Sequence, residues 1–263
     1  MVVTIVVLLI LAGVSISLIL DNNGIIQKSK DARKEYRQAQ TNEQADLESI
    51  SNFIEEIEEE SKPKVIEPKN IEDWEYTEED DGTITINSYK GNDITVIIPN
   101  YINGKPVKKT EIKEDSSTRT LWLNCTNTQY GKKQQTIKEV IISDGIEEIG
   151  DFTFVRSEAL EKVTIPRSVK ILGNNVFAGC FNLSSITIPN NVISIGAYVF
   201  TGCTGLTNIT IPSSVTSIGK NVFSDIQSIT VNVPFKEGDT PEGWNADWNF
   251  TSNSYNVTVN YLK

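Results

Sequence analysis

The stretch Leu183–Phe200 reads LSSITIPNNVISIGAYVF, and its two neighbours repeat it almost residue for residue. Leu160–Phe177 reads LEKVTIPRSVKILGNNVF and Leu206–Phe223 reads LTNITIPSSVTSIGKNVF, so each copy starts 23 residues after the one before. A fixed period of this length is typical of a solenoid, in which each repeat is one supersecondary unit stacked on its neighbours. The pattern therefore predicts a solenoid and favours surface recognition over catalysis.

Each copy divides into a strand and a return segment. Ile186 and Ile188 alternate with polar residues, which predicts a strand with one buried face, and Pro189 ends that strand because proline cannot donate to a ladder. The glycines at the position of Gly196 are expected to allow a tight turn. The phenylalanines spaced by 23 residues are expected to stack as an aromatic column in the core: Phe154, Phe177, Phe200 and Phe223.

The repeat extends beyond the three clear copies. An earlier copy runs from Ile137 to Phe154 and lacks the proline. The last copy is predicted to be shortened, because Ile229 follows Phe223 by six residues where the earlier spacing is nine.

The unit L-x-x-[IV]-T-I-P-x-x-V-x-x-[IL]-G-x-x-V-F resembles the leucine-rich repeats of the BspA type over residues 137–231. This resemblance implies a curved parallel-β solenoid of the kind found on bacterial or protist surface proteins, which are often implicated in adhesion. The tail, with Trp244, Trp248 and Asn256–Tyr261, is similar to the C-terminal cap of that family, so residues 232–263 are assigned to a cap.

Composition excludes several functions. The 263 residues include no histidine, the commonest general base, and three cysteines, too few for a disulfide framework. The net charge of −11 argues against nucleic acid as a partner. No phosphate loop, nucleophile motif or metal-ligand cluster is present, so we predict no enzyme activity, no cofactor and no metal site.

Residues 1–20 predict a transmembrane helix. Val2–Leu20 has no charge and no proline, and nineteen residues span about 28 Å, close to the roughly 30 Å of a bilayer core. Residues 21–62 predict an amphipathic helix with an apolar stripe that includes Tyr36, Leu47 and Ile54. This stripe could pack on a partner helix, on the solenoid or in a helical bundle, and a solvated spacer that holds the repeats off the membrane is an equal alternative.

A second resemblance concerns this N-terminal part. Val2–Ile16 (VVTIVVLLILAGVSI), followed by Asp21–Ile25 (DNNGI), looks like the N-terminal helix of type IV pilin-like proteins of Gram-positive bacteria. In that family a peptidase removes a short basic leader, so the resemblance implies residues upstream of Met1 and helix-mediated self-assembly. Such a leader would place the repeats outside the cell, whereas the basic residues that follow the apolar run would place them inside.

Between helix and repeats, residues 63–82 predict a charged linker with Pro63 and Pro68. Residues 83–136 predict cap strands that close the first turn of the solenoid, with a polar insert from Glu114 to Gln135. Cys180 and Cys203 occupy the same position in successive repeats. At this position we expect two buried free thiols in neighbouring coils rather than a disulfide.

The outward positions of the strands form polar rows that predict a binding surface, with a merely solubilising sheet as the alternative. The candidate ligand-binding residues are Lys162, Thr164, Ser185, Thr187, Asn208, Thr210, Ser228 and Thr230. Trp244 and Trp248 fit a carbohydrate platform or, preferably, a cap on the core.

These observations predict an α+β chain: an N-terminal membrane-spanning and amphipathic helix, then a parallel-β leucine-rich-repeat solenoid with capping strands. The predicted function is that of a bacterial cell-surface protein, anchored in the cell membrane, whose extracellular solenoid binds a protein or a glycan. The alternative is a pilin-like structural subunit that displays the repeats on a filament or pseudopilus.

Overall fold

The chain forms two compact units, Met1–Lys62 and Pro63–Lys263. The computed structural model describes residues 30–39, 63–112, 127–128, 131–132, 137–250 and 256–261. In the first unit the described residues, 30–39, are helical and exposed throughout, with Tyr36 56% exposed. The predicted transmembrane helix over residues 1–20 lies outside the described residues.

The predicted fold class is wrong in its helical part. The described chain consists mostly of strands with one short helix, and no helix within the described ranges is long and apolar enough to cross a membrane. The helix over 30–39 would span only about 15 Å, half of a bilayer core, and it carries several charges. The parallel-β solenoid is found as expected, because the repeat period determines it directly.

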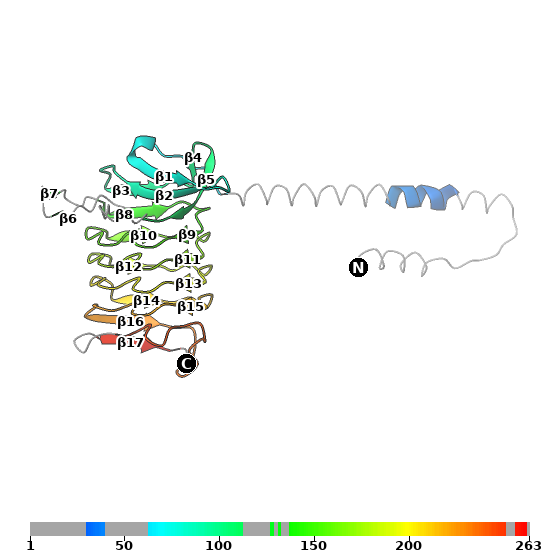
Figure 1. The fold of residues 1–263 in the computed structure, drawn as a ribbon. Coiled ribbons are helices and arrows are strands. Elements are labelled where there is room, and N and C mark those ends of the chain that lie inside the picture. The colour runs from blue at the N-terminus through cyan, green and yellow to red at the C-terminus, as the bar shows by residue number, and fades with distance from the viewer. Residues whose placement is uncertain are drawn as a thin grey trace. The chain divides into compact units, whose positions relative to one another are not determined.

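The second unit is a solenoid whose successive coils place parallel strands along two opposite sides (Figure 1). In its first repeats the first sheet follows the expected register, with Lys162 beside both Glu139 and Ser185. Its strands are β3 (Thr95–Ile98), β8 (Glu139–Ile142), β10 (Lys162–Thr164) and β12 (Ser185–Ile186), continued by β14 (Asn208–Thr210), β16 (Ser228–Asn232) and β17 (Asn256–Asn260).

The opposite sheet forms where the chain returns after each strand of the first sheet. Ile171 pairs with Glu148 and Ser194 pairs with Ser217, again in parallel. Its strands are β5 (Lys105–Thr110), β9 (Glu148–Ile149), β11 (Ile171–Leu172), β13 (Ser194–Ile195) and β15 (Ser217–Ile218).

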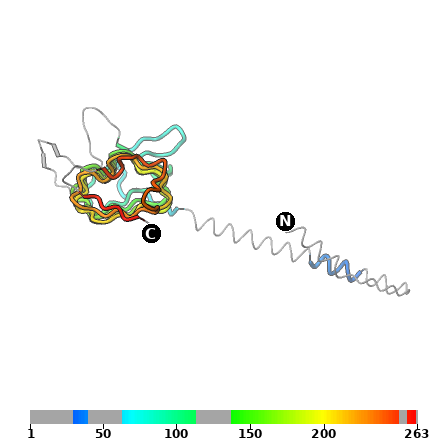
Figure 2. The backbone as a smooth tube through the Cα atoms, turned by 90° about the horizontal axis from the view of Figure 1, so that it is seen from below, coloured from blue at the N-terminus to red at the C-terminus, as the bar shows by residue number. Residues whose placement is uncertain are grey.

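The core runs along the axis of the coils, which superimpose as a flattened ring when seen end-on (Figure 2). The predicted aromatic column is confirmed: the ring centroids of Phe154, Phe177, Phe200 and Phe223 are successively 5.4, 5.6 and 5.7 Å apart, and all four side chains are fully buried. Their backbones also bond from coil to coil, as from Phe177 N to Val199 O at 2.9 Å. Aromatic stacking and burial therefore hold each coil to the next.

Gly196 and the glycines at the same position of the other repeats allow neighbouring coils to pack closely. They do not form the tight turn that was expected. A Cβ atom on Gly196 would lie 2.6 Å from the backbone carbon of Gly173 in the preceding coil, so the coils can approach only where a side chain is missing. The turn itself uses left-handed backbone at non-glycine residues, including Asn175 (φ 55°) and Tyr198 (φ 60°).

The N-terminal end is closed by an antiparallel extension of the return sheet. β1 (Trp74–Glu78) pairs with β2 (Ile84–Tyr89), which continues the sheet beside β5. Trp74 and Tyr89 pack at 4.6 Å and are buried. The remaining elements are η1 (Ile71–Asp73), β4 (Tyr101–Ile102), and the pair β6 (Asn127–Thr128) and β7 (Gly131–Lys132).

Residues 63–82, predicted as a linker, thus contain η1 and β1 and belong to the folded unit. The buried Asn100 side chain secures the start of this segment, because its Nδ2 donates to Lys64 O at 2.9 Å and its Oδ1 accepts from Ile66 N at 2.7 Å. The charge and proline content of this segment indicated a linker. Its pairing with residues far along the chain makes it part of the cap instead. The rest of the predicted insert, 114–126, 129–130 and 133–135, lies outside the described residues.

The C-terminal end is closed by two tryptophans, as preferred from the sequence. Trp248 packs edge-on against Phe223 at 6.1 Å, and Trp244 packs against Trp248 at 5.1 Å. The indole Nε1 of Trp244 donates to Val215 O at 3.1 Å, so its polar atom is satisfied although the side chain is 6% exposed. These rings are therefore part of the core and offer no carbohydrate platform.

Candidate ligand-binding face

The candidate site is the outward surface of the sheet that begins with β3, which we call the ligand face. Inward positions such as Val163 and Ile209 are buried in the core, whereas the alternate residues point outward because side chains alternate along a strand. Seven of the eight predicted residues are exposed and Thr230 is half-buried: Lys162, Thr164, Ser185, Thr187, Asn208, Thr210, Ser228 and Thr230.

The structure changes the register of the last predicted residues. Val231, rather than Ile229, lies beside Ile209, so the final copy is one residue shorter than the others. Consequently Thr230 lies beside Asn208, whereas Ser228 lies beside Asn256 of β17. The sequence pattern suggested Ile229 as the neighbour of Ile209. Ile229 and Val231 alternate with polar residues in the same way, so either of them could have occupied that position.

The ligand face consists of two hydrogen-bonded panels. The first panel comprises β3, β8, β10 and β12, and the second comprises β14, β16 and β17. Within the described part of the chain, no ladder pair joins β12 to β14, although these strands are neighbours. The surface therefore changes its hydrogen-bonding pattern between Ser185 and Asn208.

The first panel carries charge. Lys162 Nζ lies 2.7 Å from Glu139 Oε1, and Lys138 Nζ lies 2.8 Å from Glu161 Oε1. Lys162, Lys138 and Glu161 are more than half exposed. Such pairs contribute about 0–1 kcal/mol to stability, so they define the surface chemistry more than the fold.

The second panel carries amides and hydroxyls. Asn232 Nδ2 donates to Asn208 Oδ1 at 3.2 Å and to Thr210 Oγ1 at 3.3 Å. Asn260 Nδ2 donates in turn to Asn232 Oδ1 at 2.8 Å. This amide ladder crosses all three strands of the panel and fixes its side chains in place. Asn232 and Asn260 were not predicted as site residues, because the shifted register of the last copy concealed them.

The beginning of the ligand face is apolar. Ile94 and Ile97, in and just before β3, are 62% and 46% exposed, and Ile97 lies beside Ile141 of β8. Both isoleucines lie within residues 83–136, for which the sequence predicts cap strands and no role in binding.

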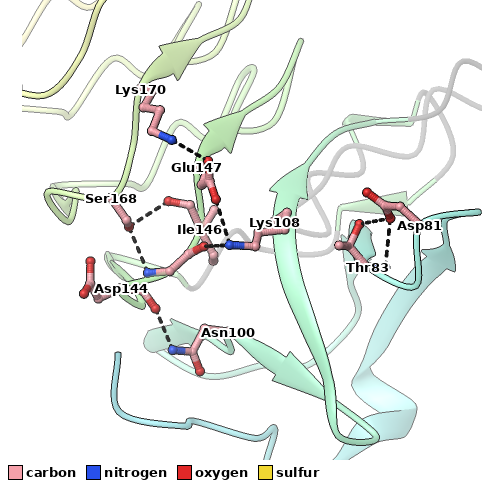
Figure 3. Close-up of polar contacts among 10 residues, drawn as sticks. Asp81, Thr83, Asn100, Lys108, Asp144, Ile146, Glu147, Ser168 and Lys170 are labelled. Atoms are coloured by element: carbon pink, nitrogen blue, oxygen red, sulfur yellow. Dashed lines mark hydrogen bonds and ion pairs between the residues drawn. The ribbon is translucent and has the colours of Figure 1, made fainter. Parts of the chain in front are cut away.

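The opposite sheet is flanked by an ion-pair ladder in which Glu147 lies between Lys108 and Lys170 (Figure 3). Each ammonium nitrogen lies 2.7 Å from a Glu147 oxygen, and the two hydrogen bonds lower the pKa of this carboxyl to about 2. Nearby, Ser168 Oγ donates to Ile146 O at 2.8 Å and accepts from Gly145 N at 2.9 Å. These contacts join neighbouring coils and offer no site for a ligand.

The thiols of Cys180 and Cys203 are buried and not joined by a disulfide. Their Sγ atoms donate to Phe154 O and Phe177 O, each at 3.1 Å, and burial raises the pKa of the Cys203 thiol to about 12. A thiol with so high a pKa is a poor nucleophile. Among the described residues, no group of three or more Cys, Asp or Glu is arranged to hold a metal ion.

Comparison with known proteins agrees with this geometry. Residues 128–239 match the family described as "BspA type Leucine rich repeat region", in six copies. The repeat region is thus similar to the BspA-type leucine-rich repeats over these residues. No curated protein matches the sequence.

Solved structures of other leucine-rich repeat proteins resemble the solenoid. The leucine-rich repeat protein of T. pallidum, TpLRR, is 24% identical with a TM-score of 0.54, and the match covers 64% of this chain and 73% of that chain. A leucine-rich cell surface protein of Faecalibacterium prausnitzii is 27% identical with a TM-score of 0.51, and the match covers 66% of this chain and 44% of that one. The present chain thus spans less than half of the Faecalibacterium protein.

The family match begins at residue 128 and therefore does not bear on the N-terminal residues. The resemblance of the N-terminal part, from residue 2 to about residue 50, to type IV pilin-like proteins stays a prediction.

Proposed function

We propose that this BspA-type leucine-rich-repeat protein is a bacterial cell-surface adhesin that binds its ligand on the ligand face. The observation that carries this proposal is the exposed polar surface of the two panels. The outward side chains are not part of the buried core that holds the coils together. The Faecalibacterium relative, named a cell surface protein, supports the location. An extended sheet of this kind is the usual binding surface of solenoid proteins.

The chemistry of the second panel favours a glycan over a charged protein. Its described strands β14, β16 and β17 contain only uncharged residues, and the amide ladder through Asn208, Asn232 and Asn260 is held in one geometry. Such a surface can exchange hydrogen bonds with sugar hydroxyls at a small cost in side-chain entropy. The charged first panel would instead suit a protein ligand.

The proposal is tested by incubating the purified full chain with an array of glycans and extracellular-matrix proteins. Thr187→Arg places a bulky cation in the middle of the ligand face, and we expect it to weaken binding at least about tenfold. Thr216→Arg is the matched control, because Thr216 is equally an exposed threonine but flanks the opposite sheet. Circular dichroism of both variants checks that the fold is retained.

Two results would overturn the proposal. One is an array on which the wild-type chain binds nothing. The other is equal loss of binding for both variants, which would place the binding surface elsewhere. Binding to matrix proteins but not to glycans would retain the face and reject the glycan.

A further inference from the structure

The last strand of the ligand face, β17, has one side that bonds to no other described residue. Two hydrogen bonds show which backbone groups of β17 face β16. Asn256 N donates to Gln227 O at 3.1 Å, and Asn260 O accepts from Val233 N at 3.0 Å. Backbone groups of alternate residues point to opposite edges of a strand. Val257 and Val259 therefore turn their N–H and C=O groups away from β16, toward the end of the solenoid (Figure 1).

This edge lacks the features that prevent strand pairing. At the other end of the molecule, the edge strand β1 carries two glutamates, Glu75 and Glu78, and a register shift between Glu75 and Tyr76. Charges and bulges of this kind protect an edge strand from pairing with another chain. β17 has no charged residue, no proline and a continuous register with β16.

The sequence of β17 is also self-complementary. It reads Asn256-Val257-Thr258-Val259-Asn260, which is the same in both directions. In an antiparallel pair of two such strands, with a two-fold axis at Thr258, each Asn faces Asn, each Val faces Val, and Thr258 faces itself. Val257 then lies opposite Val259 of the second copy, and such hydrogen-bonded pairs exchange two bonds each.

We propose that β17 is a self-association edge, through which two copies of this chain pair in antiparallel orientation about a two-fold axis at Thr258. An isologous contact of this kind satisfies the same backbone groups on both copies. No like charges oppose one another within the paired strands, and β-branched and threonine cross-strand pairs are favourable. The two second panels then form one continuous amide-rich surface.

The size of the contact determines its strength. Five residues on each side bury less than the roughly 1,200–2,000 Å² of a stable interface, so the dimer is expected to be weak and concentration-dependent. Two copies held on one surface would pair more readily, because tethering raises their effective concentration. The inference does not depend on the ligand of the face.

Cross-linking of the full chain provides a test that is specific to Thr258. Across the two-fold axis the two Cα atoms of Thr258 lie at a non-hydrogen-bonded position, about 4.5 Å apart, within the range of about 4.4–6.8 Å for a disulfide. We expect Thr258→Cys, treated with a mild copper oxidant, to form a covalent dimer whose yield rises with protein concentration. Thr210→Cys, an exposed threonine of the same panel away from the edge, is the matched control and should not form it.

A charge exchange tests the two-fold axis independently. Thr258→Lys and Thr258→Glu each place like charges opposite one another, and sedimentation of either variant alone should show at least about tenfold weaker dimerisation than wild type. Mixing the two variants should restore the dimer, because lysine then faces glutamate. The same two changes at Thr210 should have no such effect.

The proposal is overturned if Thr258→Cys forms no more dimer than Thr210→Cys. Failure of the mixed charge variants to dimerise would also reject the two-fold pairing.

Discussion

The coils that carry the first panel stack Phe154, Phe177 and Phe200 at successive distances of 5.4 and 5.6 Å, and the coil of β14, which begins the second panel, stacks Phe223 on Phe200 at 5.7 Å. The two panels therefore rest on the same core. Their outer surfaces nevertheless differ, since the first is charged around Lys162 and the second is an uncharged amide ladder through Asn232. The repeat therefore keeps its buried residues nearly constant, whereas its outward residues differ from coil to coil.

The largest expected effect comes from the core at the junction of the panels. Phe200→Ala removes a fully buried ring between Phe177 and Phe223, and we expect the free energy of unfolding to fall by about 3–5 kcal/mol. Chemical denaturation followed by tryptophan fluorescence measures this loss. Tyr198→Ala, at a half-exposed ring of the same coil, should cost much less. Equal losses would show that the aromatic column is not the common support of both panels.

The second prediction compares a buried amide with an exposed one. Asn100, which follows the first panel, is 2% exposed and bonds to Lys64 O, Asp144 O and Ile66 N. Asn100→Ala leaves these backbone groups unsatisfied and should destabilise the chain by roughly 2–4 kcal/mol.

Its counterpart in the second panel is Asn232→Ala, for which we expect a change within about 0.5 kcal/mol because water can replace the lost bonds. Denaturant-induced unfolding of Asn100→Ala and Asn232→Ala measures the change in the free energy of unfolding for each. A large loss for Asn232→Ala would mean that the amide ladder maintains the fold rather than the surface.

The smallest expected effect concerns pH. The pKa of Glu147 is lowered to about 2 from an ordinary value near 4.5, so its contribution to stability is complete above about pH 4.5 and is lost as the pH falls toward 2. Both lysine partners and Glu147 are more than a third exposed, which limits the contribution to about 1 kcal/mol or less.

Glu147→Gln should therefore reduce stability slightly at pH 7 and leave it nearly unchanged at pH 2, as measured by thermal melts across this range. A larger difference between wild type and variant at pH 2 than at pH 7 would contradict the assigned ion pairs.

The interior of the solenoid could be predicted from the sequence, because residues such as Phe177 and Ile186 recur at a fixed period that only stacking explains. Outward residues up to Thr210 followed from the same period. The prediction failed where the period changes. Val231 follows Phe223 by eight residues instead of nine, so Ser228 was wrongly expected to lie beside Asn208.

The cap could not be predicted in the same way. β1 is held by pairing with β2 and by the burial of Trp74, and these contacts are not visible in local composition, which is rich in Glu and Asp. The amide ladder was hidden for a related reason, because Asn260 belongs to a strand outside the repeat.

The most direct test of the account compares binding by the two panels. The full chain, Asn232→Ala and Lys162→Ala are titrated against the strongest glycan from the array. Loss of the Asn232 amide should weaken binding about tenfold, since a hydrogen bond contributes about 0.5–1.5 kcal/mol and the ladder would lose its order. Lys162→Ala should stay within about twofold. The opposite order, a large loss for Lys162→Ala and none for Asn232→Ala, would contradict recognition by the uncharged panel.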